Sequence, residues 1–309
     1  MSTDFVFLYP GQGAQQVGMG KEFYEEFSVA RHLMDQADEL VDFDLKQLCF
    51  EGPEEKLNTT KFTQPAVFVV SMMATGVLAE KGIKPAATAG HSLGEYAALC
   101  AAGVYDFATG LELVRRRGEL MNDAFPPGMG TMVAVIGLGD EEVSSLCSRV
   151  EGICEVANYN SPGQIVVSGE KEALSSFTEF AEKEGARKVI ELDVSGPFHC
   201  SLMEAAQEEF VSYLESLDFS VPDIPVVANV SADFVETAAE VRSLLAAQLT
   251  ESVRWVESME LLLGAGYEIF IESGTGRVLR GLMRRIDRSA KVLSVNGMSS
   301  LNKALNKLG

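Results

Sequence analysis

The sequence predicts an α/β fold with a parallel sheet, into which a smaller ferredoxin-like unit is inserted. Apolar stretches of strand length alternate with helical patterns along most of the 309 residues, which is typical of helices packed on a sheet. Between residues 130 and 194 the predicted order changes to β-α-β-β-α-β, with the glycine- and proline-rich segments PPGMG and SGP beside its ends. We therefore expect a large domain of residues 1–129 and 195–309 and an inserted subdomain of residues 130–194.

The predicted elements follow one another in this order. FVFLYP is a strand that ends at the glycine turn GQG, and AATAG is a short strand that leads to Ser92. The apolar segment 66–79 is shorter than a bilayer span and is predicted to be a buried helix. The later strands are IPVVANV, YEIFIESG and KVLSVNG. In the insert the predicted strands are TMVAVIGL, ICEVANYN, GQIVVSG and RKVIELDV, and the predicted helices are DEEVSSLCSRV and KEALSSFTEFAEKEG.

Composition and charge exclude several kinds of protein. The formal net charge is −20, whereas nucleic acids and anionic membranes attract basic surfaces. The five cysteines form no CxxC pair, the three histidines show no metal-ligand spacing, and the N-terminus lacks the basic segment of a signal peptide. We expect a monomeric cytoplasmic protein with reduced thiols that binds neither nucleic acid, membrane nor metal.

Ser92 lies in the segment GHSLG (90–94), which fits the pattern G-x-S-x-G of a nucleophile elbow. A strand precedes it and the helical run LGEYAALCAAG follows, so its hydroxyl would stand at a helix N-terminus, where negative charge is favoured. The alternative is a glycine-rich turn with a capping serine.

A serine nucleophile needs a base, and the chain has three histidines. His32 lies among charged residues of a predicted helix and is expected at the surface. His91 adjoins Ser92, but adjacent side chains at a sharp turn usually point apart. His199 in GPFHCSLM remains, where the insert rejoins the large domain; a purely structural histidine is the alternative.

Arg117 stands on the apolar side of a predicted helix. At about 100° per residue, Arg116 falls opposite the apolar arc of FATGLELVRRRGELM, Arg115 falls at its margin and Arg117 falls inside it. A buried guanidinium requires an anionic or polar partner. The partner is either a carboxylate of the chain itself or the carboxylate of a substrate, bound in a bidentate manner.

Six segments, in this order, resemble one family: YPGQGAQQVGMG, GHSLGEYAAL, RRRGELM, NYNSPGQIVVSG, GPFHCSLM and AAQLTESVRW. The sequence resembles the malonyl-CoA:acyl carrier protein transacylases, acyltransferases of fatty acid synthesis, over nearly its whole length. The resemblance implies an α/β-hydrolase-like core with an inserted ferredoxin-like subdomain. It also implies that malonyl-CoA and acyl carrier protein are the substrates and that no cofactor is needed.

The resemblance implies roles for individual residues. Ser92 would carry the malonyl group and His199 would be the base, oriented by an amide residue, matched here by Gln248, and by backbone carbonyls. Gln12 and Leu93 would supply backbone N–H groups to the oxyanion hole. The expected kinetics are ping-pong, through malonyl-Ser92.

Substrate selection is implied for four further positions. Arg117 would bind the free malonyl carboxylate, and Phe198, beside the base, would leave little room for an α-methyl group. Gly196 and Pro197 before it depart from the family pattern. We also place His91 and Met121 among the residues that contact the substrate.

Acyl carrier proteins are acidic and this chain is acidic too, so docking requires a local basic patch. The segment GRVLRGLMRRIDRSAK places Arg277, Arg280 and Arg284 on one helix face. The alternatives are a solvated face with local salt bridges, or contacts with CoA phosphates.

Three other functions remain possible at this point. An acyltransferase that serves a polyketide synthase would use the same chemistry with another carrier. A serine thioesterase would use water as acceptor and would have no use for Arg117. An inactive carrier-binding protein would have no need of Ser92, His199 and Arg117, all of which are present.

Overall fold

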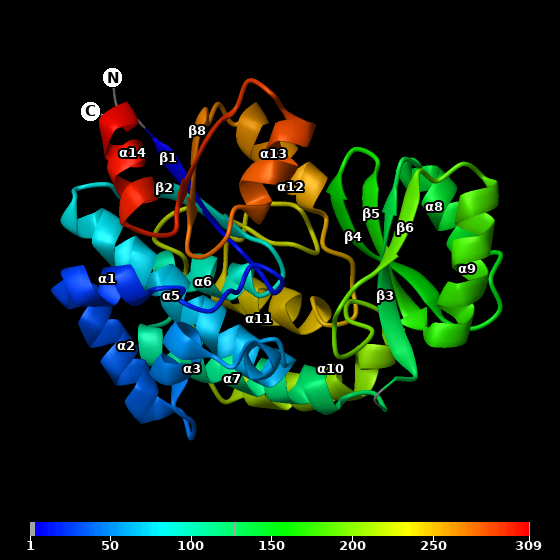
Figure 1. Ribbon diagram of the computed structural model, residues 1–309, viewed down its shortest axis with the longest axis horizontal. Coiled ribbons are helices and arrows are strands. Elements are labelled where there is room, and N and C mark those ends of the chain that lie inside the picture. Colours follow the sequence, from blue (N-terminus) through cyan, green and yellow to red (C-terminus); the bar gives the residue numbers. More distant parts are fainter. Residues whose placement is uncertain (1–3, 127, 309) are drawn as a thin grey trace.

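The computed structural model describes residues 4–126 and 128–308 and shows a mixed α/β fold with two separate sheets (Figure 1). In the five-stranded sheet, of order β7-β2-β1-β8-β9, all neighbouring strands are parallel. In the four-stranded sheet, of order β4-β5-β3-β6, all neighbouring strands are antiparallel. The parallel strands are β1 (Phe5–Tyr9), β2 (Pro85–Gly90), β7 (Val226–Val227), β8 (Ile269–Ser273) and β9 (Lys291–Val295).

Helices cover both faces of the parallel sheet. The side chains of the central strand β1 alternate between two apolar clusters, with Phe7 and Tyr9 in one and Val6 and Leu8 in the other, and all four are fully buried. A parallel strand that is covered on both faces in this way is apolar at every position. The helices and the 3-10 turn outside the insert are α1 (Lys21–Glu26), α2 (Ser28–Leu40), α3 (Leu45–Glu51), α4 (Glu54–Leu57), α5 (Thr60–Glu80), α6 (Gly94–Ala101), α7 (Phe107–Asp123), η1 (Ser201–Met203), α10 (Glu204–Glu215), α11 (Ala238–Ala247), α12 (Trp255–Gly264), α13 (Val278–Ile286) and α14 (Met298–Leu308).

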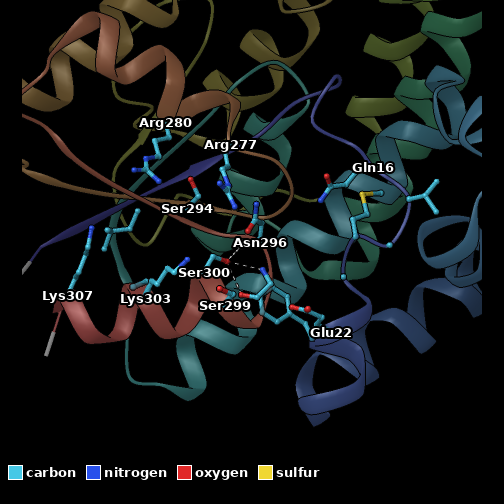
Figure 2. A pocket seen from close by; sticks show the side chains of 18 residues that line it. Gln16, Glu22, Arg277, Arg280, Ser294, Asn296, Ser299, Ser300, Lys303 and Lys307 are labelled. Carbon is cyan, nitrogen blue, oxygen red and sulfur yellow. Dashed lines mark hydrogen bonds between the residues drawn. The ribbon is translucent and has the colours of Figure 1, made fainter.

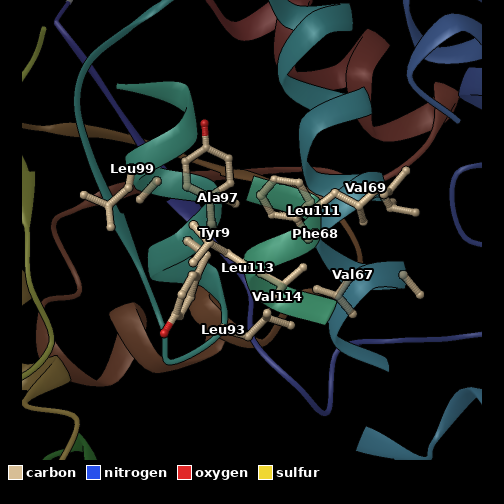
Figure 3. Close-up of a cluster of buried hydrophobic side chains, with 14 of the residues drawn as sticks. Tyr9, Val67, Phe68, Val69, Leu93, Ala97, Leu99, Leu111, Leu113 and Val114 are labelled. Carbon is tan, nitrogen blue, oxygen red and sulfur yellow. The ribbon is translucent and has the colours of Figure 1, made fainter. Parts of the chain in front are cut away.

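Helices α5, α6 and α7 pack against one another beside the sheet and form much of the larger cluster. Figure 3 shows side chains of all three helices meeting near Tyr9 of β1. Ser92 lies just before α6 and Arg117 lies on α7, so the packing of these two helices sets the distance between the two side chains. The labelled members are Tyr9, Val67, Phe68, Val69, Leu93, Ala97, Leu99, Leu111, Leu113 and Val114.

The second sheet has the predicted order of elements, strand-helix-strand-strand-helix-strand. Its elements are β3 (Gly130–Ile136), α8 (Asp140–Cys147), β4 (Cys154–Ser161), β5 (Gln164–Glu170), α9 (Lys171–Lys183) and β6 (Lys188–Glu191). It has a small apolar core of its own under α8 and α9. The unit is tied to the rest of the chain through Val253, whose backbone N–H and C=O bond to Ala157 and Tyr159 of β4.

Two sequence predictions need correction. The apolar helix begins at Thr60, well before residue 66, because the polar first turn continues the same helix; among the described helices it alone is long and apolar enough to cross a membrane. Its burial was predicted correctly, since 72% of its most apolar window lies inside the protein. The strand expected in IPVVANV is only two residues long, because the chain folds back after Val227 and pairs with residues 233–234.

Candidate active site

Ser92 lies in a tight turn between β2 and α6, with a φ angle of 50°, in the left-handed region that most residues avoid. Two glycines make this turn possible. A Cβ on Gly90 would lie 1.9 Å from the carbonyl carbon of Gly94, and a Cβ on Gly94 would lie 2.0 Å from the backbone oxygen of Tyr9. The turn therefore requires glycine at both positions of GHSLG, and it is held in a strained conformation that exposes the serine.

Asn229, which follows β7, holds the turn from beneath. Its Oδ1 accepts a hydrogen bond from the Ser92 backbone N–H at 2.7 Å, and its Nδ2 donates to the Gly90 carbonyl at 2.7 Å. Because both ends of the amide are used on backbone atoms of the elbow, Asn229 fixes its position relative to the sheet.

His199 is the histidine that the structure brings to Ser92. The Ser92 Oγ and the His199 Nε2 are 2.7 Å apart, and the His199 Nδ1 is 2.7 Å from the backbone carbonyl oxygen of Gln248. Since a carbonyl only accepts, Nδ1 carries the proton and Nε2 is free to accept one from the serine. Burial, reinforced by the nearby Arg117 charge, lowers the pKa of His199 to about 3, so the ring is neutral at pH 7.

The role expected for Gln248 needs a correction. Its backbone carbonyl, and not its side-chain amide, contacts His199. The side-chain Oε1 instead accepts from Arg117 at 3.0 Å, and Nε2 donates to the Ser92 carbonyl at 3.1 Å. The amide therefore joins the arginine to the elbow.

The other two histidines lie elsewhere. His32 is exposed on α2. The His91 ring is not bonded to Ser92. Its Nε2 lies 2.6 Å from Asn160 Oδ1, and its ring centre lies 5.3 Å from that of Trp255. His91 nevertheless lines the cleft into which Ser92 opens.

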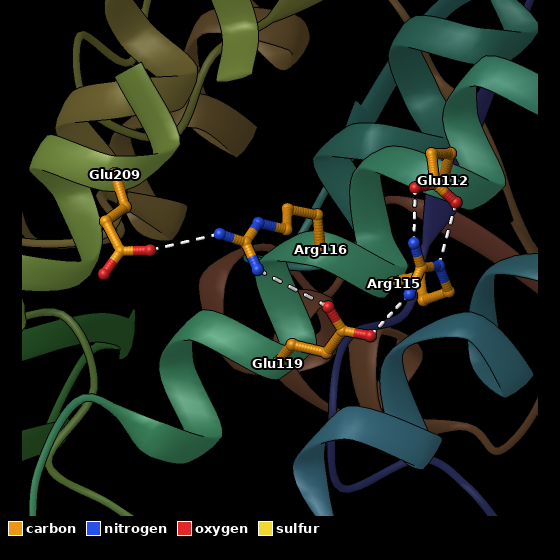
Figure 4. A network of polar contacts seen from close by, with 5 residues as sticks. All are labelled: Glu112, Arg115, Arg116, Glu119 and Glu209. Atoms are coloured by element: carbon orange, nitrogen blue, oxygen red, sulfur yellow. Dashed lines mark hydrogen bonds and ion pairs between the residues drawn. The ribbon is translucent and has the colours of Figure 1, made fainter. Parts of the chain in front are cut away.

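The three consecutive arginines of α7 have different surroundings. Arg115 and Arg116 lie on the outer face and pair with acidic side chains, as Figure 4 shows. Arg115 is 2.5 Å from both Glu112 and Glu119, and Arg116 is 3.1 Å from Glu209. These exposed pairs contribute about 1 kcal/mol or less each.

Arg117 is 1% exposed and points toward Ser92. Its Nη1 donates to Gln64 Oε1 at 2.9 Å, and its Nη2 donates to Ser92 Oγ at 3.1 Å as well as to Gln248. The guanidinium also lies 5.2 Å from the centre of the Tyr96 ring. All these partners are formally neutral.

The internal carboxylate considered as a partner for Arg117 is not found. Within residues 4–126 and 128–308 the guanidinium has no carboxylate oxygen within 4.0 Å, and its Nε has no hydrogen-bond partner. A buried cation that is bound only by neutral groups is suited to receive an anion.

Ser92 and Arg117 open into a cleft of about 490 Å³ between the two sheets. Phe198 and Met121 contribute apolar walls. A Cβ on Gly196 would lie 3.2 Å from the ring of Phe198. Gly196 thus makes room for the ring beside the base. The lining residues are Gln12, Gly13, Gln15, Glu54, Asn58, His91, Ser92, Arg117, Met121, Met132, Asn158, Leu192, Asp193, Val194, Phe198 and His199.

Two backbone N–H groups at the cleft are available to a ligand. In the part of the chain that the structure describes, those of Gln12 and Leu93 donate to no protein acceptor. The Gln12 side chain donates to Thr60 Oγ1 at 3.1 Å, which anchors the loop after β1 beside the elbow.

Comparisons with known proteins identify the family of this chain. Residues 6–296 match the model of the acyl transferase domain. The chain belongs to the acyl transferase family.

The relatives of this acyl transferase carry more specific names. The malonyl CoA-acyl carrier protein transacylase of Bacillus subtilis (strain 168) is 42% identical over 99% of this chain and 98% of its own. The enzyme of the same name from Staphylococcus aureus (strain MRSA252) is 40% identical over 95% and 96%. These matches confirm the family resemblance seen in the sequence.

Solved structures of relatives superpose closely on the acyl transferase. A malonyl-transacylase in complex with a type II PKS acyl-carrier protein has a TM-score of 0.96 and 40% identity, covering 98% of this chain and 99% of that chain. An acyl carrier protein S-malonyltransferase from Vibrio cholerae has a TM-score of 0.95 and 39% identity, covering 97% and 99%.

Sequence reasoning missed three polar residues of the acyl transferase site: Gln64, Glu95 and Asn229. Glu95 stands in the otherwise apolar helical run GEYAALCA, so the test of polar residues on a buried face that was applied to Arg117 would have found it. Gln64 gave a weaker signal, because it lies in the polar first turns of α5. Asn229 had no such pattern, because it lies in an irregular segment after β7. No cluster of three or more potential metal ligands occurs among the described residues of the acyl transferase.

Proposed function

We propose that this acyl transferase moves the malonyl group of malonyl-CoA to the phosphopantetheine thiol of acyl carrier protein in fatty acid biosynthesis. The observation that carries the proposal is the position of Ser92 Oγ, 2.7 Å from His199 Nε2 and 3.1 Å from Arg117 Nη2. A nucleophile and a base therefore lie beside a buried cation that pairs with no carboxylate among the described residues. The names of the relatives specify the same acyl group and carrier.

The reaction proceeds in two half-reactions through malonyl-Ser92. His199 Nε2 takes the Ser92 proton as Oγ attacks the thioester carbonyl, and the imidazolium then gives that proton to the departing CoA thiolate. In the second half-reaction His199 takes the proton of the carrier's thiol, whose sulfur attacks the serine ester, and returns it to Ser92. The Gln248 carbonyl holds Nδ1–H throughout and replaces the aspartate of a Ser-His-Asp triad.

The backbone N–H groups of Gln12 and Leu93 form the oxyanion hole for both tetrahedral intermediates. Such donors contribute about 3 to 4 kcal/mol each in comparable sites. Leu93 adjoins the nucleophile at the start of α6, so its N–H also benefits from the positive end of the helix.

Arg117 binds the malonyl carboxylate, and the apolar walls define the remaining space. Binding replaces the contact between Arg117 Nη2 and Ser92 Oγ, which frees the hydroxyl to attack. Phe198 beside the base favours malonyl over an α-methylated acyl group on steric grounds, and Met121 and His91 line the cleft near it.

The finer description of the fold is also part of the proposal. The parallel-sheet part corresponds to an α/β-hydrolase-like core of residues 1–129 and 195–309, and residues 130–194 form the ferredoxin-like subdomain. The order of elements and the strand order β4-β5-β3-β6 support the latter. Residues 1–3, 127 and 309 of these ranges lie outside the described residues.

A cytoplasmic location and a monomeric state complete the proposal, and gel filtration tests the latter.

Transfer and hydrolysis are distinguished by following both products. We expect malonyl-CoA and the holo carrier protein to give one malonyl-carrier per CoA released, with parallel lines in double-reciprocal initial-rate plots. Release of free malonate without acylation of the carrier would replace the proposal by a thioesterase. Intersecting lines, which indicate an obligatory ternary complex, would contradict the covalent intermediate.

An acyltransferase that serves a polyketide synthase is the second candidate. The relative in complex with a type II PKS acyl-carrier protein, with a TM-score of 0.96, is the observation that favours it. Both candidates use the same residues. The rates with the two classes of holo carrier protein distinguish them.

The carrier dock requires a revision of the expected arginine face. Arg277 precedes α13, which begins at Val278, and Arg284 lines a separate hollow with Arg285 and Arg288. Arg277 and Arg280 instead line a hollow of about 580 Å³ together with Lys303 and Lys307 of α14. Figure 2 shows the two arginines facing the two lysines across this hollow, which we call the basic pocket.

The basic pocket is the better candidate for the dock. Among the described residues none of its four cations forms an ion pair, although the chain has 45 acidic residues. Its wall includes Gln16 to Gly20, which continue the loop whose Gln12, Gly13 and Gln15 line the catalytic cleft. An acidic partner in this pocket would thus lie next to the oxyanion loop.

Charge reversal tests the dock. We expect Arg280→Glu to raise the KM for the carrier protein several-fold at low salt, because the pocket then repels an acidic partner, and to leave the KM for malonyl-CoA unchanged. The matched control is Lys188→Glu, the same charge change on exposed β6. An unchanged KM in Arg280→Glu, with a raised KM in Arg284→Glu, would move the dock to the hollow of Arg284; a raised KM for malonyl-CoA would assign the pocket to CoA phosphates.

A further inference from the structure

Glu95 is a buried carboxylate beneath the site that the reaction described above does not use. It lies three residues after Ser92, in the first turn of α6, and is 1% exposed. Burying an ionisable group without partners is costly, so its contacts indicate what it does.

The contacts of Glu95 all lead to residues that hold the catalytic groups. Its Oε2 accepts hydrogen bonds from Gln248 Nε2 at 2.6 Å and from the Asn229 backbone N–H at 3.1 Å. Gln248 in turn accepts from Arg117, and Asn229 accepts from the Ser92 N–H. Glu95 is thus one residue removed from both the nucleophile and the cation.

The contact with Gln248 determines which way that amide points. Gln248 Nε2 faces three acceptors, of which Glu95 Oε2 is the nearest at 2.6 Å and the only carboxylate; the Ser92 carbonyl and Asn229 Oδ1 lie at 3.1 and 3.3 Å. The opposite end, Oε1, consequently faces the guanidinium of Arg117. If the amide were reversed, the Gln248 NH2 group would face the N–H groups of Arg117, donor against donor, and the Gln248 oxygen would face the Glu95 carboxylate, acceptor against acceptor.

Charge supports the same connection. Arg117 is bound directly only by formally neutral groups, and Glu95 is the carboxylate one amide away from it. Burial raises the pKa of Glu95 to about 7, while the donors from Asn229 and Gln248 and the charge of Arg117 act in the opposite direction. The charge of Arg117 therefore favours the ionised form of Glu95. The Glu95 carboxylate in turn favours the orientation of Gln248 in which Oε1 faces Arg117.

We propose that Glu95 is a positioning residue for acyl-group selection, which acts through Gln248 to hold the Arg117 guanidinium in the geometry that receives a carboxylate. The inference rests on the proposed function, which supplies a carboxylated acyl group. Glu95 forms no hydrogen bond with Ser92 Oγ or with Arg117, so we expect its loss to weaken binding of the malonyl carboxylate more than it slows the attack on the thioester.

The test compares loading of malonyl and acetyl groups, measured as intact-protein mass in single-turnover reactions with the two CoA thioesters. We expect Glu95→Met, which keeps the volume but removes the acceptors, to lower kcat/KM for malonyl loading about tenfold and that for acetyl loading about twofold or less. Glu95→Gln keeps an acceptor oxygen for Gln248 and should restore most of the malonyl loading.

Glu272 offers a matched control. It is another glutamate that is 1% exposed, and it binds the backbone N–H groups of Leu279 and Arg280, away from Arg117 and Gln248. Glu272→Met should leave the malonyl-to-acetyl ratio unchanged even where it lowers the melting temperature.

Each outcome decides the inference. An equal loss of malonyl and acetyl loading in Glu95→Met would assign Glu95 to support of the elbow alone and overturn the proposal. Wild-type rates for both thioesters would overturn it as well. Where Glu95→Met does not fold, Gln248→Leu must show the malonyl-selective loss; failure to do so overturns the relay. A wild-type enzyme that loads neither group would overturn the proposed function, and this inference with it.

Discussion

Ser92→Ala is expected to abolish the malonyl adduct that the wild-type protein forms with malonyl-CoA. The hydroxyl that lies 2.7 Å from His199 Nε2 is then missing, and the remaining oxyanion donors and binding contacts cannot supply a nucleophile. We expect malonyl transfer to fall by about four orders of magnitude or more. Intact-protein mass detects the adduct, and release of CoA measures the rate.

The control for this prediction uses the base and the fold. His199→Ala should cause a similar loss, and the double variant should be little worse than either single one, because the two side chains act as a unit. The melting temperature of Ser92→Ala should stay close to that of the wild type. Serine and alanine both carry a Cβ, so the left-handed backbone at residue 92 strains both residues similarly, and alanine adds no bulk. A malonyl adduct that persists in Ser92→Ala would show that another residue carries the acyl group.

Arg117→Ala is expected to change which acyl group is loaded. The variant loses a charge-assisted contact with the malonyl carboxylate, which is worth about 1.5 to 3 kcal/mol, so kcat/KM for malonyl-CoA should fall about ten- to one-hundredfold. Acetyl-CoA has no carboxylate and should be affected far less, so the malonyl-to-acetyl ratio falls. Single-turnover loading with each thioester measures that ratio.

Arg116→Ala is the matched control, since Arg116 precedes Arg117 on the same helix but pairs with Glu119 and Glu209 at the surface. Its malonyl-to-acetyl ratio should equal that of the wild type. Should Arg117→Ala slow both thioesters equally, the arginine would support the fold or the Ser92 hydroxyl, and the carboxylate site would have to be sought elsewhere in the cleft.

The elements that were predicted well are those whose signal is local. The β-α-β-β-α-β order of residues 130–194 follows from short-range periodicity and turn residues, and the structure shows that order. The strand expected in IPVVANV is only two residues long, because the chain folds back after Val227 and pairs with residues 233–234, which leaves Asn229 outside the strand and beside the elbow. Apolar composition alone gives no indication of such an interruption.

Details of the site follow the same division. Gln248 was matched by resemblance to the residue that orients the base, but the orientation of a side-chain amide depends on neighbours that come from distant segments. Here Glu95 and Arg117 bind its two ends, and only the backbone carbonyl remains for His199. The three arginines assigned to one helix face are likewise divided between two hollows: Arg277, which precedes α13, and Arg280 line the basic pocket, whereas Arg284 lines the other hollow with Arg285 and Arg288.

The sequence by itself determined the α/β class, the elbow at Ser92 and the burial of Arg117, because each depends on a pattern within one segment: alternating elements, glycines that allow a close turn, or a charge on an apolar helix face. Only the tertiary structure decided that Arg117 has no carboxylate partner among the described residues, that His199 Nδ1 bonds to a carbonyl and not to an acid, and that Glu95 is connected to both Arg117 and Ser92 through Gln248 and Asn229. These facts depend on distances between side chains far apart in the chain, which the packing of α5, α6, α7 and α11 around the sheet sets.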